Sequence, residues 1–240
     1  MNVIGVIPAR FSSARFAGKV LADLGGKPVV QHVWENARKS KMLDDLIIAS
    51  DDERVLKAAR DFGAKAVYTS PDQPSGSDRL IEVINPMDVK IVVNIQGDEP
   101  MVRPEMIDGL AGAILEDKNV YMATLAKKID DKSEIDNPNV VKVVKDKNGF
   151  ALYFSRSVIP YPRHETVSMY YKHIGLYAYT KDFLFQFKNL QKSYLEMTEG
   201  LEQLRVLENG YKIKVIETKF DTIGIDTPED LEKARAVIGR

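Results

Sequence analysis

Three cations follow the first apolar run of the chain. Arg10, Arg15 and Lys19 lie among small residues, after a run of β-branched and small residues from Val3 to Ile7. Pro8 cannot donate to a sheet ladder, so a strand formed by this run should end there. A solvated surface loop is one interpretation. Because ligands in open α/β sheets bind beyond the carboxyl ends of strands, however, the three cations favour a site for a polyphosphate.

The loop matches neither of two common phosphate-binding signatures. A Walker loop ending at Lys19 would need glycine in place of Ser13, and serine or threonine in place of Val20. A dinucleotide fingerprint would need G-x-G-x-x-G after the first strand, and the only glycine before the loop is Gly5. The loop should therefore hold phosphate with side chains as well as backbone groups, which disfavours a kinase or a dehydrogenase.

Two aspartates far apart in the sequence are candidates for a metal site. Asp98 follows the apolar run from Ile91 to Ile95, beside Gly97, which would let a ligand approach the backbone. Asp226 precedes Thr227-Pro228, where the threonine can cap the last helix by itself. The alternatives are a turn role for Asp98 and a capping role for Asp226. Mg²⁺ prefers oxygen ligands and often binds one or two carboxylates together with substrate phosphates, so the pair is suited to it.

Five further polar side chains can have either a binding role or a purely structural one. Arg156 follows a strand-like run and could pair bidentately with a carboxylate. His173 and Tyr177 lie four residues apart on one expected strand and so face the same side, although a strand histidine is more often a satisfied core residue. Glu202 and Gln203 should open a helix, where a first-turn acid also suits the helix dipole.

The opening stretch, IPARFSSARFAGK followed by LADLGGKPVVQHV, resembles the amino-terminal signature of sugar nucleotidyltransferases. Together with GDEP, YFSR and LEQLR, it most resembles the family of cytidylyltransferases that activate 3-deoxy-manno-octulosonate, Kdo. The resemblance covers nearly the whole chain. It implies that the anomeric hydroxyl of Kdo attacks the α-phosphate of CTP, giving CMP-Kdo for lipopolysaccharide biosynthesis and releasing pyrophosphate, with Mg²⁺ as cofactor.

The resemblance also implies roles for individual residues. The catalytic residues would be Lys19, Asp98 and Asp226, with Asp98 and Asp226 as metal ligands. The nucleotide would contact Pro8, Ala9, Arg10, Arg15, Lys19, Ser75, Gly76, Arg79, Gln96, Gly97 and Asp98. The sugar would contact Gln96, Arg156, His173, Tyr177, Glu202 and Gln203. In the segment from Ser75 to Arg79, hydroxyl and backbone groups would meet the pyrimidine edge, although by itself it is equally a turn before a helix.

Other functions stay open at this point. The acceptor could be 8-amino-Kdo, because one substituent at the far end of a sugar can be distinguished by a single contact. It could also be a sialic acid, because the sialic acid cytidylyltransferases share the opening loop and use an acidic sugar, although GDEP, YFSR and LEQLR resemble the Kdo branch. A noncatalytic nucleotide-sugar sensor could use the same sheet. Such a sensor would tolerate loss of Lys19, Asp98 or Asp226, and the chain keeps all three.

These candidates need a fold that brings them together. Strand and helix patterns alternate through the first half, which predicts an α/β fold with a wound, mostly parallel nucleotide-binding sheet. The resemblance implies the glycosyltransferase-A-like nucleotidyltransferase fold. We expect one domain over residues 1–240. Residues 137–180, with the hairpin signal Asn148-Gly149, should form an antiparallel excursion that carries sugar-binding and homodimer contacts. The loops after the parallel strands should converge at one edge of the sheet.

The composition excludes several classes of function. The net charge of −1, from 34 basic and 35 acidic residues, gives no reason to expect a nucleic-acid partner. The absence of cysteine excludes disulfides and thiol catalysis. No apolar run reaches the roughly 18 residues of a membrane helix, and no signal segment is recognisable, so we expect a cytoplasmic protein without a membrane partner.

Overall fold

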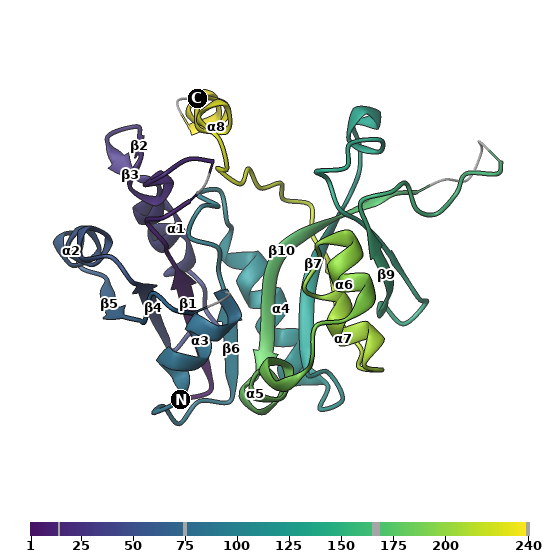
Figure 1. The fold of residues 1–240 in the computed structure, drawn as a ribbon, viewed down its shortest axis with the longest axis horizontal. Coiled ribbons are helices and arrows are strands. Elements are labelled where there is room, and N and C mark those ends of the chain that lie inside the picture. Colours follow the sequence, from purple (N-terminus) through teal and green to yellow (C-terminus); the bar gives the residue numbers. More distant parts are fainter. Residues whose placement is uncertain (14, 74–75, 165–168, 239–240) are drawn as a thin grey trace.

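The computed structural model describes residues 1–13, 15–73, 76–164 and 169–238. Within them, a mixed sheet forms the centre of the molecule (Figure 1). Its main path runs in the order β11-β7-β10-β6-β1-β4-β5. These strands are β1 (Val3–Pro8), β4 (Asp45–Ser50), β5 (Lys65–Tyr68), β6 (Ile91–Asn94), β7 (Met122–Lys128), β10 (Tyr171–Thr180) and β11 (Lys214–Glu217). β10 is antiparallel to both its neighbours, whereas the remaining pairs of the path are parallel. The predicted wound, mostly parallel sheet is confirmed.

Helices cover both faces of this sheet, as expected for strands that are apolar on both sides. One face packs against α1 (Val29–Ala37), α2 (Glu53–Asp61) and α4 (Pro104–Glu116). The other packs against α3 (Gly76–Ile84), α5 (Lys181–Asn189) and α7 (Leu204–Glu208), with α6 (Tyr194–Glu199) beside α7. The sequence interpretation missed α4, although Met106, Leu110 and Ile114 recur at helical spacing on its buried side.

The antiparallel excursion joins the main sheet. β8 (Lys142–Lys145) and β9 (Ala151–Ser155) form the hairpin predicted from Asn148-Gly149. β8 also pairs with β10, which lies between β6 and β7 at the centre of the main path. Residues 137–180 therefore both project from the body of the molecule, on the right of Figure 1, and supply one of its central strands.

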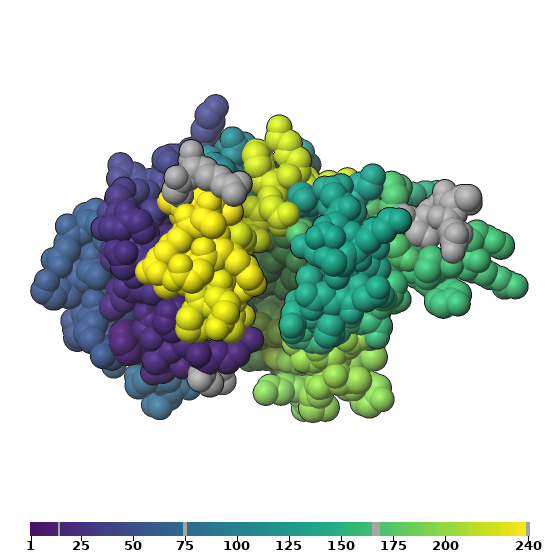
Figure 2. Space-filling view, turned by 90° about the horizontal axis from the view of Figure 1, so that it is seen from above, coloured from purple at the N-terminus to yellow at the C-terminus, as the bar shows by residue number. Residues whose placement is uncertain are grey.

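The C-terminal segment returns to the first loop of the chain. α8 (Pro228–Ile238) packs against the two-stranded ribbon of β2 (Asp23–Leu24) and β3 (Lys27–Pro28) (Figures 1 and 2). Leu231 and Ala234 of α8 form a small apolar cluster with Leu24 and Val29. This packing brings the residues just before α8 beside the short 3-10 helix η1 (Lys19–Leu21).

Two smaller features complete the description. A second 3-10 helix, η2 (Lys132–Glu134), follows β7. None of the described helices is both long enough and apolar enough to cross a membrane.

Candidate active site

A cavity of about 390 Å³ lies where the carboxyl ends of β1 and β6 meet. Seen from this edge of the sheet, the surface is hollowed between α8 and the segment around η2 (Figure 2). The residues that line the cavity come from four distant parts of the chain: Pro8, Arg10, Ser12, Ser13, Arg15, Lys19, Val20, Gly76, Gln96, Gly97, Asp98 and Asp226. The expected convergence of the loops at one sheet edge is therefore observed.

Lys19 joins the two predicted metal ligands. Its ammonium donates to Asp98 Oδ2 at 2.5 Å and to Asp226 Oδ1 at 2.8 Å, and Arg15 pairs with the other oxygen of Asp226 at 2.9 Å. The backbone N–H of Ile225 also donates to the Asp98 carbonyl at 2.9 Å, which ties the two acidic segments together. Burial lowers the pKa of Lys19, but the two carboxylates outweigh burial and raise the pKa above its ordinary value. The ammonium is therefore charged at neutral pH.

Asp226 is free for this role because another residue caps α8. The Thr227 hydroxyl accepts from the Asp230 N–H, and the Asp230 carboxylate accepts in return from the Thr227 N–H and hydroxyl. This reciprocal pairing satisfies donors at the start of the helix without the Asp226 side chain. The predicted capping by Thr227 is confirmed.

The acidic residues suit a metal whose coordination is completed by substrate. The described residues contain no cluster of three or more His, Cys, Asp or Glu side chains able to hold a metal by themselves. Asp98 and Asp226 supply two carboxylates at the cavity wall, and Mg²⁺ commonly takes its remaining ligands from phosphates and water. One carboxylate oxygen of the adjacent Glu99 is buried, and burial, followed by the charge of Asp98, raises the pKa of Glu99 to about 8. Near neutral pH Glu99 is therefore mostly protonated and adds little negative charge.

Gly97 is required by the chain itself. A Cβ atom at this position would lie 2.8 Å from the carbonyl oxygen of Pro8, closer than ordinary contacts allow. Gly97 also lines the cavity, so the prediction that it lets a ligand approach the backbone stays a prediction, and the close contact with the end of β1 is a second reason for glycine here. The glycine holds the ends of β1 and β6 together and so shapes the cavity floor.

Two residues predicted to bind nucleotide lie behind the cavity wall. Ala9 is buried and its N–H donates to the Ala49 carbonyl. The Arg79 guanidinium is fully buried, pairs with Asp51 at 2.9 Å and donates to the Thr69 hydroxyl. Neither residue lines the cavity, and the predicted contact at Ser75 falls outside the described residues. Ser12, Ser13 and Val20, which do line it, were missed because a serine or valine in a loop carries no distinctive signal.

A second cavity of about 230 Å³ adjoins the first and shares Gly76 and Gln96 with it. Four of the six residues predicted to contact the sugar line the second cavity, namely Gln96, Tyr177, Glu202 and Gln203. The remaining lining residues besides Gly76 are Ser77, Asn94, Met122, Tyr179 and Phe187. Glu202 and Gln203 were expected to open a helix, but they precede α7. The Glu202 carboxylate accepts from the Ser77 hydroxyl at 3.2 Å, and burial raises its pKa.

The other two predicted sugar contacts lie outside this lining. His173 packs against Tyr177, with ring centroids 5.5 Å apart, so the two side chains share a side as predicted. Its Nε2 lies 2.9 Å from the Thr124 hydroxyl, and burial lowers its pKa to about 3, so the ring is neutral. Arg156 donates to the backbone carbonyls of Glu199 and Pro138, and a role on the sugar would require it to exchange these bonds.

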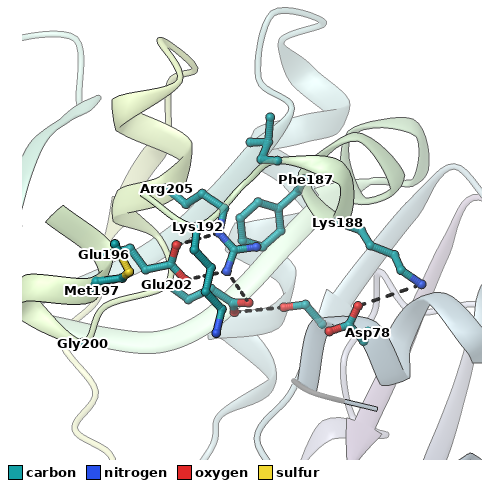
Figure 3. A pocket seen from close by; sticks show the side chains of 11 residues that line it. Asp78, Phe187, Lys188, Lys192, Glu196, Met197, Gly200, Glu202 and Arg205 are labelled. Carbon is teal, nitrogen blue, oxygen red and sulfur yellow. Dashed lines mark hydrogen bonds and ion pairs between the residues drawn. The ribbon is translucent and has the colours of Figure 1, made fainter. Parts of the chain in front are cut away.

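A third and wider cavity, of about 560 Å³, opens from the second, with which it shares Ser77, Phe187 and Glu202 (Figure 3). On one wall Arg205 pairs with Glu196 at 2.5 Å and approaches Glu202 at 3.7 Å. On the opposite wall Lys188 lies 3.9 Å from Asp78. Acidic and basic side chains both line this cavity. It therefore has no excess of either charge that would favour an anion or a cation.

The fold and the cationic cavity define a nucleotidyltransferase, and comparison with known proteins specifies the class. Residues 4–213 match the family described as Cytidylyltransferase, so the chain belongs to that family. Curated relatives are named 3-deoxy-manno-octulosonate cytidylyltransferase. The relative from Geotalea uraniireducens is 49% identical, with 97% of each chain covered. That from Solibacter usitatus is 51% identical, covering 97% of this chain and 92% of its own.

Solved structures agree with this assignment. A CMP:2-keto-3-deoxy-manno-octonic acid synthetase, solved in complex with CTP, matches with a TM-score of 0.95 and 43% identity over 100% of this chain and 99% of its own. A 4-diphosphocytidyl-2C-methyl-D-erythritol synthase from Anaerococcus prevotii matches with a TM-score of 0.65 and 19% identity, over 99% of this chain and 98% of its own, which shows a shared fold alone. The chain belongs to the 3-deoxy-manno-octulosonate cytidylyltransferase family.

Proposed function

We propose that this protein transfers CMP from CTP to the anomeric hydroxyl of Kdo in a magnesium-dependent reaction that releases pyrophosphate. The observation that carries the proposal is the meeting of Lys19, Asp98 and Asp226 at the wall of the first cavity, in a chain whose relatives carry this name. CTP would occupy the first cavity and the sugar the second. The shared residues Gly76 and Gln96 mark where the α-phosphate and the attacking hydroxyl would meet.

The side chains of the first cavity provide what an in-line displacement at phosphorus requires. Arg10, Arg15 and Lys19 would hold the phosphates and neutralise the charge that develops as pyrophosphate leaves. Asp98 and Asp226 would hold Mg²⁺, which when bound neutralises phosphate charge and orients the reacting oxygens. No covalent enzyme intermediate is required.

The second cavity suits a polyhydroxylated acceptor. The side chains of Gln96, Tyr177, Glu202 and Gln203 offer hydrogen-bonding groups of both kinds on its walls. The aromatic walls would cover the apolar faces of a sugar ring. Within this proposal, Arg156 and His173 would contact the sugar, as predicted from the sequence. Ser75 and Arg79 would contact the base.

The proposal is tested by measuring pyrophosphate release with CTP and each of three acceptors, namely Kdo, 8-amino-Kdo and a sialic acid. We expect turnover with Kdo in the presence of Mg²⁺ and its loss on chelation. Turnover only with 8-amino-Kdo or the sialic acid would reassign the acceptor. Binding of nucleotide sugar with no turnover for any acceptor would identify a sensor.

The Asp98→Asn variant tests the metal ligand within the same assay. The amide keeps the size of the side chain but removes its charge, so magnesium-dependent turnover should fall at least about 100-fold while the thermal unfolding midpoint stays close to that of the wild type. Asp61→Asn is a matched control, because Asp61 pairs with Lys57 on the exposed side of α2. Unchanged turnover in Asp98→Asn would remove Asp98 from the metal site.

Two further features belong to this proposal. The protein would act in the cytoplasm, where CTP is available, and its product would serve lipopolysaccharide biosynthesis. A homodimer would form through residues 137–180, where Leu152, Tyr161 and Met169 expose 62%, 83% and 59% of their surface. Exposed apolar side chains of this kind are common at protein interfaces.

A further inference from the structure

β6 ends on a buried polar residue in a position suited to an apolar one. The strand reads Ile-Val-Val-Asn, and Asn94 lies on the same face as Val92 because side chains alternate along a strand. Its sheet neighbours at this level are Val6 of β1 and Tyr177 of β10. Only 4% of Asn94 is exposed. Burying an amide is unfavourable unless its hydrogen bonds to water are replaced, so an asparagine here calls for an explanation.

The fold leaves one end of this amide without a partner. The Asn94 side chain hydrogen-bonds the Tyr179 hydroxyl, which also bonds Ser77. Among the described residues, however, nothing hydrogen-bonds the buried Oδ1 of Asn94. Asn94 lines the second cavity, so a small molecule bound there would lie beside the side chain that carries this unsatisfied, buried acceptor.

A complementary donor lies on the wall of the same cavity. Gln203 is 5% exposed, and its buried Nε2 is likewise without a partner among the described residues. A hydroxyl group donates one hydrogen bond and accepts others, so it can satisfy an unpaired acceptor and an unpaired donor together. A sugar, which carries several hydroxyls, is the class of ligand that matches this pair.

We propose that Asn94 is a specificity-determining residue for the acceptor, with its Oδ1 accepting a hydrogen bond from one hydroxyl of the sugar acid while Gln203 Nε2 donates to the sugar. The inference rests on the proposed function and adds to it a residue from β6. Asn94 lies two residues before Gln96 and four before Asp98. A sugar hydroxyl held at Asn94 is thus held on the segment that carries the proposed metal ligand, which fixes the acceptor relative to the α-phosphate.

Steady-state kinetics of Asn94→Ala test this role. We expect the KM for Kdo to rise about 10- to 100-fold, since each factor of ten corresponds to about 1.4 kcal/mol of lost interaction, while the KM for CTP stays within about twofold. A control asparagine must lie away from both cavities and from the segment of Asp98. Asn36 is unsuitable because it donates to the Pro100 carbonyl near Asp98. Asn119→Ala is therefore the control: the exposed Asn119 amide donates to Asp117 at 3.0 Å in the turn after α4 and lines neither cavity, and both KM values should stay close to the wild type.

A second measurement varies the acceptor as well as the protein. Monodeoxy analogues of Kdo, each lacking one hydroxyl, are compared as acceptors in the wild type and in Asn94→Ala. With the wild type, one analogue should show a kcat/KM about tenfold or more below that of Kdo. With the variant, the same analogue should show nearly the same kcat/KM as Kdo, because the hydrogen bond is already absent. If Asn94→Ala fails to fold by circular dichroism, Asn94→Val, which fills the position but has no acceptor, replaces it.

The outcomes separate this inference from the proposed function. Equal rises in both KM values, unchanged KM values, or additive losses for every analogue would overturn the role of Asn94 and leave the activity intact. A wild type that releases no pyrophosphate with Kdo would overturn the proposed function. Calorimetric binding of Kdo that is lost in Asn94→Ala would then still support the contact, and no binding by the wild type would overturn both.

Discussion

At the scale of single residues, the site depends on one cation between two acids. Asp98 and Asp226 both lie within 2.8 Å of the Lys19 ammonium, and Lys19 is only 13% exposed. Two carboxylates brought together without a cation would repel each other strongly in such partly buried surroundings. Lys19 therefore holds the acidic pair together, and under the proposed function it would compete with Mg²⁺ for the same oxygens.

Lys19→Met tests this competition. The variant keeps the length and apolar character of the side chain but removes the ammonium. We expect Mn²⁺, measured by electron paramagnetic resonance without nucleotide, to bind more tightly than to the wild type. Turnover with CTP should fall about 100-fold or more, since a charged contact to the phosphates is lost.

Lys27→Met provides the comparison, because the Lys27 ammonium pairs with Glu35 of α1. It should change neither Mn²⁺ binding nor turnover. Weaker Mn²⁺ binding in Lys19→Met would show that the lysine supports the metal site instead of competing for it.

His173 predicts a pH dependence of stability. Burial lowers its pKa in the folded protein to about 3, whereas in the unfolded chain it is near 6.5. Below pH 6.5 the unfolded state therefore binds a proton that the folded state does not, and stability falls as the pH drops toward 3. The contribution is at most about 1.4 kcal/mol per pH unit. In urea unfolding between pH 7 and pH 4, His173→Gln should lose less stability than the wild type, and parallel curves would contradict this assignment.

At the scale of secondary-structure elements, the cavity depends on strand ends that meet closely. β1 and β6 are parallel neighbours, and Gly97 allows the backbone beyond β6 to contact Pro8 at the end of β1. α8 then packs on β2 and β3 and places Asp226 beside Asp98. Small changes in these contacts should therefore alter nucleotide binding before they alter the fold.

Gly97→Ala tests this close approach. The added Cβ would lie 2.8 Å from the Pro8 carbonyl, so the two loops must separate. We expect a loss of about 1–3 kcal/mol in the free energy of unfolding and a raised KM for CTP. Gly112→Ala in α4, whose Cβ would have no neighbour closer than 3.9 Å, should instead stabilise by about 0.5–1 kcal/mol. Equal stability changes in the two variants would show that the Pro8 contact is not limiting.

At the scale of the whole molecule, the antiparallel strand β10 links the nucleotide half to the rest. It pairs with β6 on one side and β7 on the other, and its beginning also pairs with β8 of the projecting hairpin. Contacts made by the hairpin can thus be transmitted to Tyr177, which lines the second cavity. A homodimer through the hairpin would therefore adjoin the acceptor site.

The homodimer is tested by light scattering after gel filtration. We expect a species of twice the chain mass of 27.0 kDa that dissociates when Leu152 and Tyr161 are both replaced by glutamate. Placing two charges on an apolar interface should weaken it by several orders of magnitude. Tyr68→Glu at the opposite edge of the sheet, where Tyr68 is also exposed, should leave the mass unchanged. A monomeric wild type would contradict the prediction.

Local patterns in the sequence by themselves determined much of this protein. The apolar runs predicted strands β1, β4 and β6, and Asn148-Gly149 predicted the hairpin. Thr227-Pro228 predicted the start of α8. Each of these features depends on neighbours within a few residues. The cations of the first loop and the two aspartates were recognisable by type and position. A resemblance to a known family supplied the reaction.

The tertiary structure alone decided which of these groups meet. It placed β10 at the sheet centre, Lys19 between Asp98 and Asp226, and Arg79 in a buried pair with Asp51. It also left the oxygen of Asn94, a residue that lines the second cavity, without a partner among the described residues. These facts depend on contacts between segments far apart in the chain, whose pairing is set by packing of the whole sheet and by which charges become buried together.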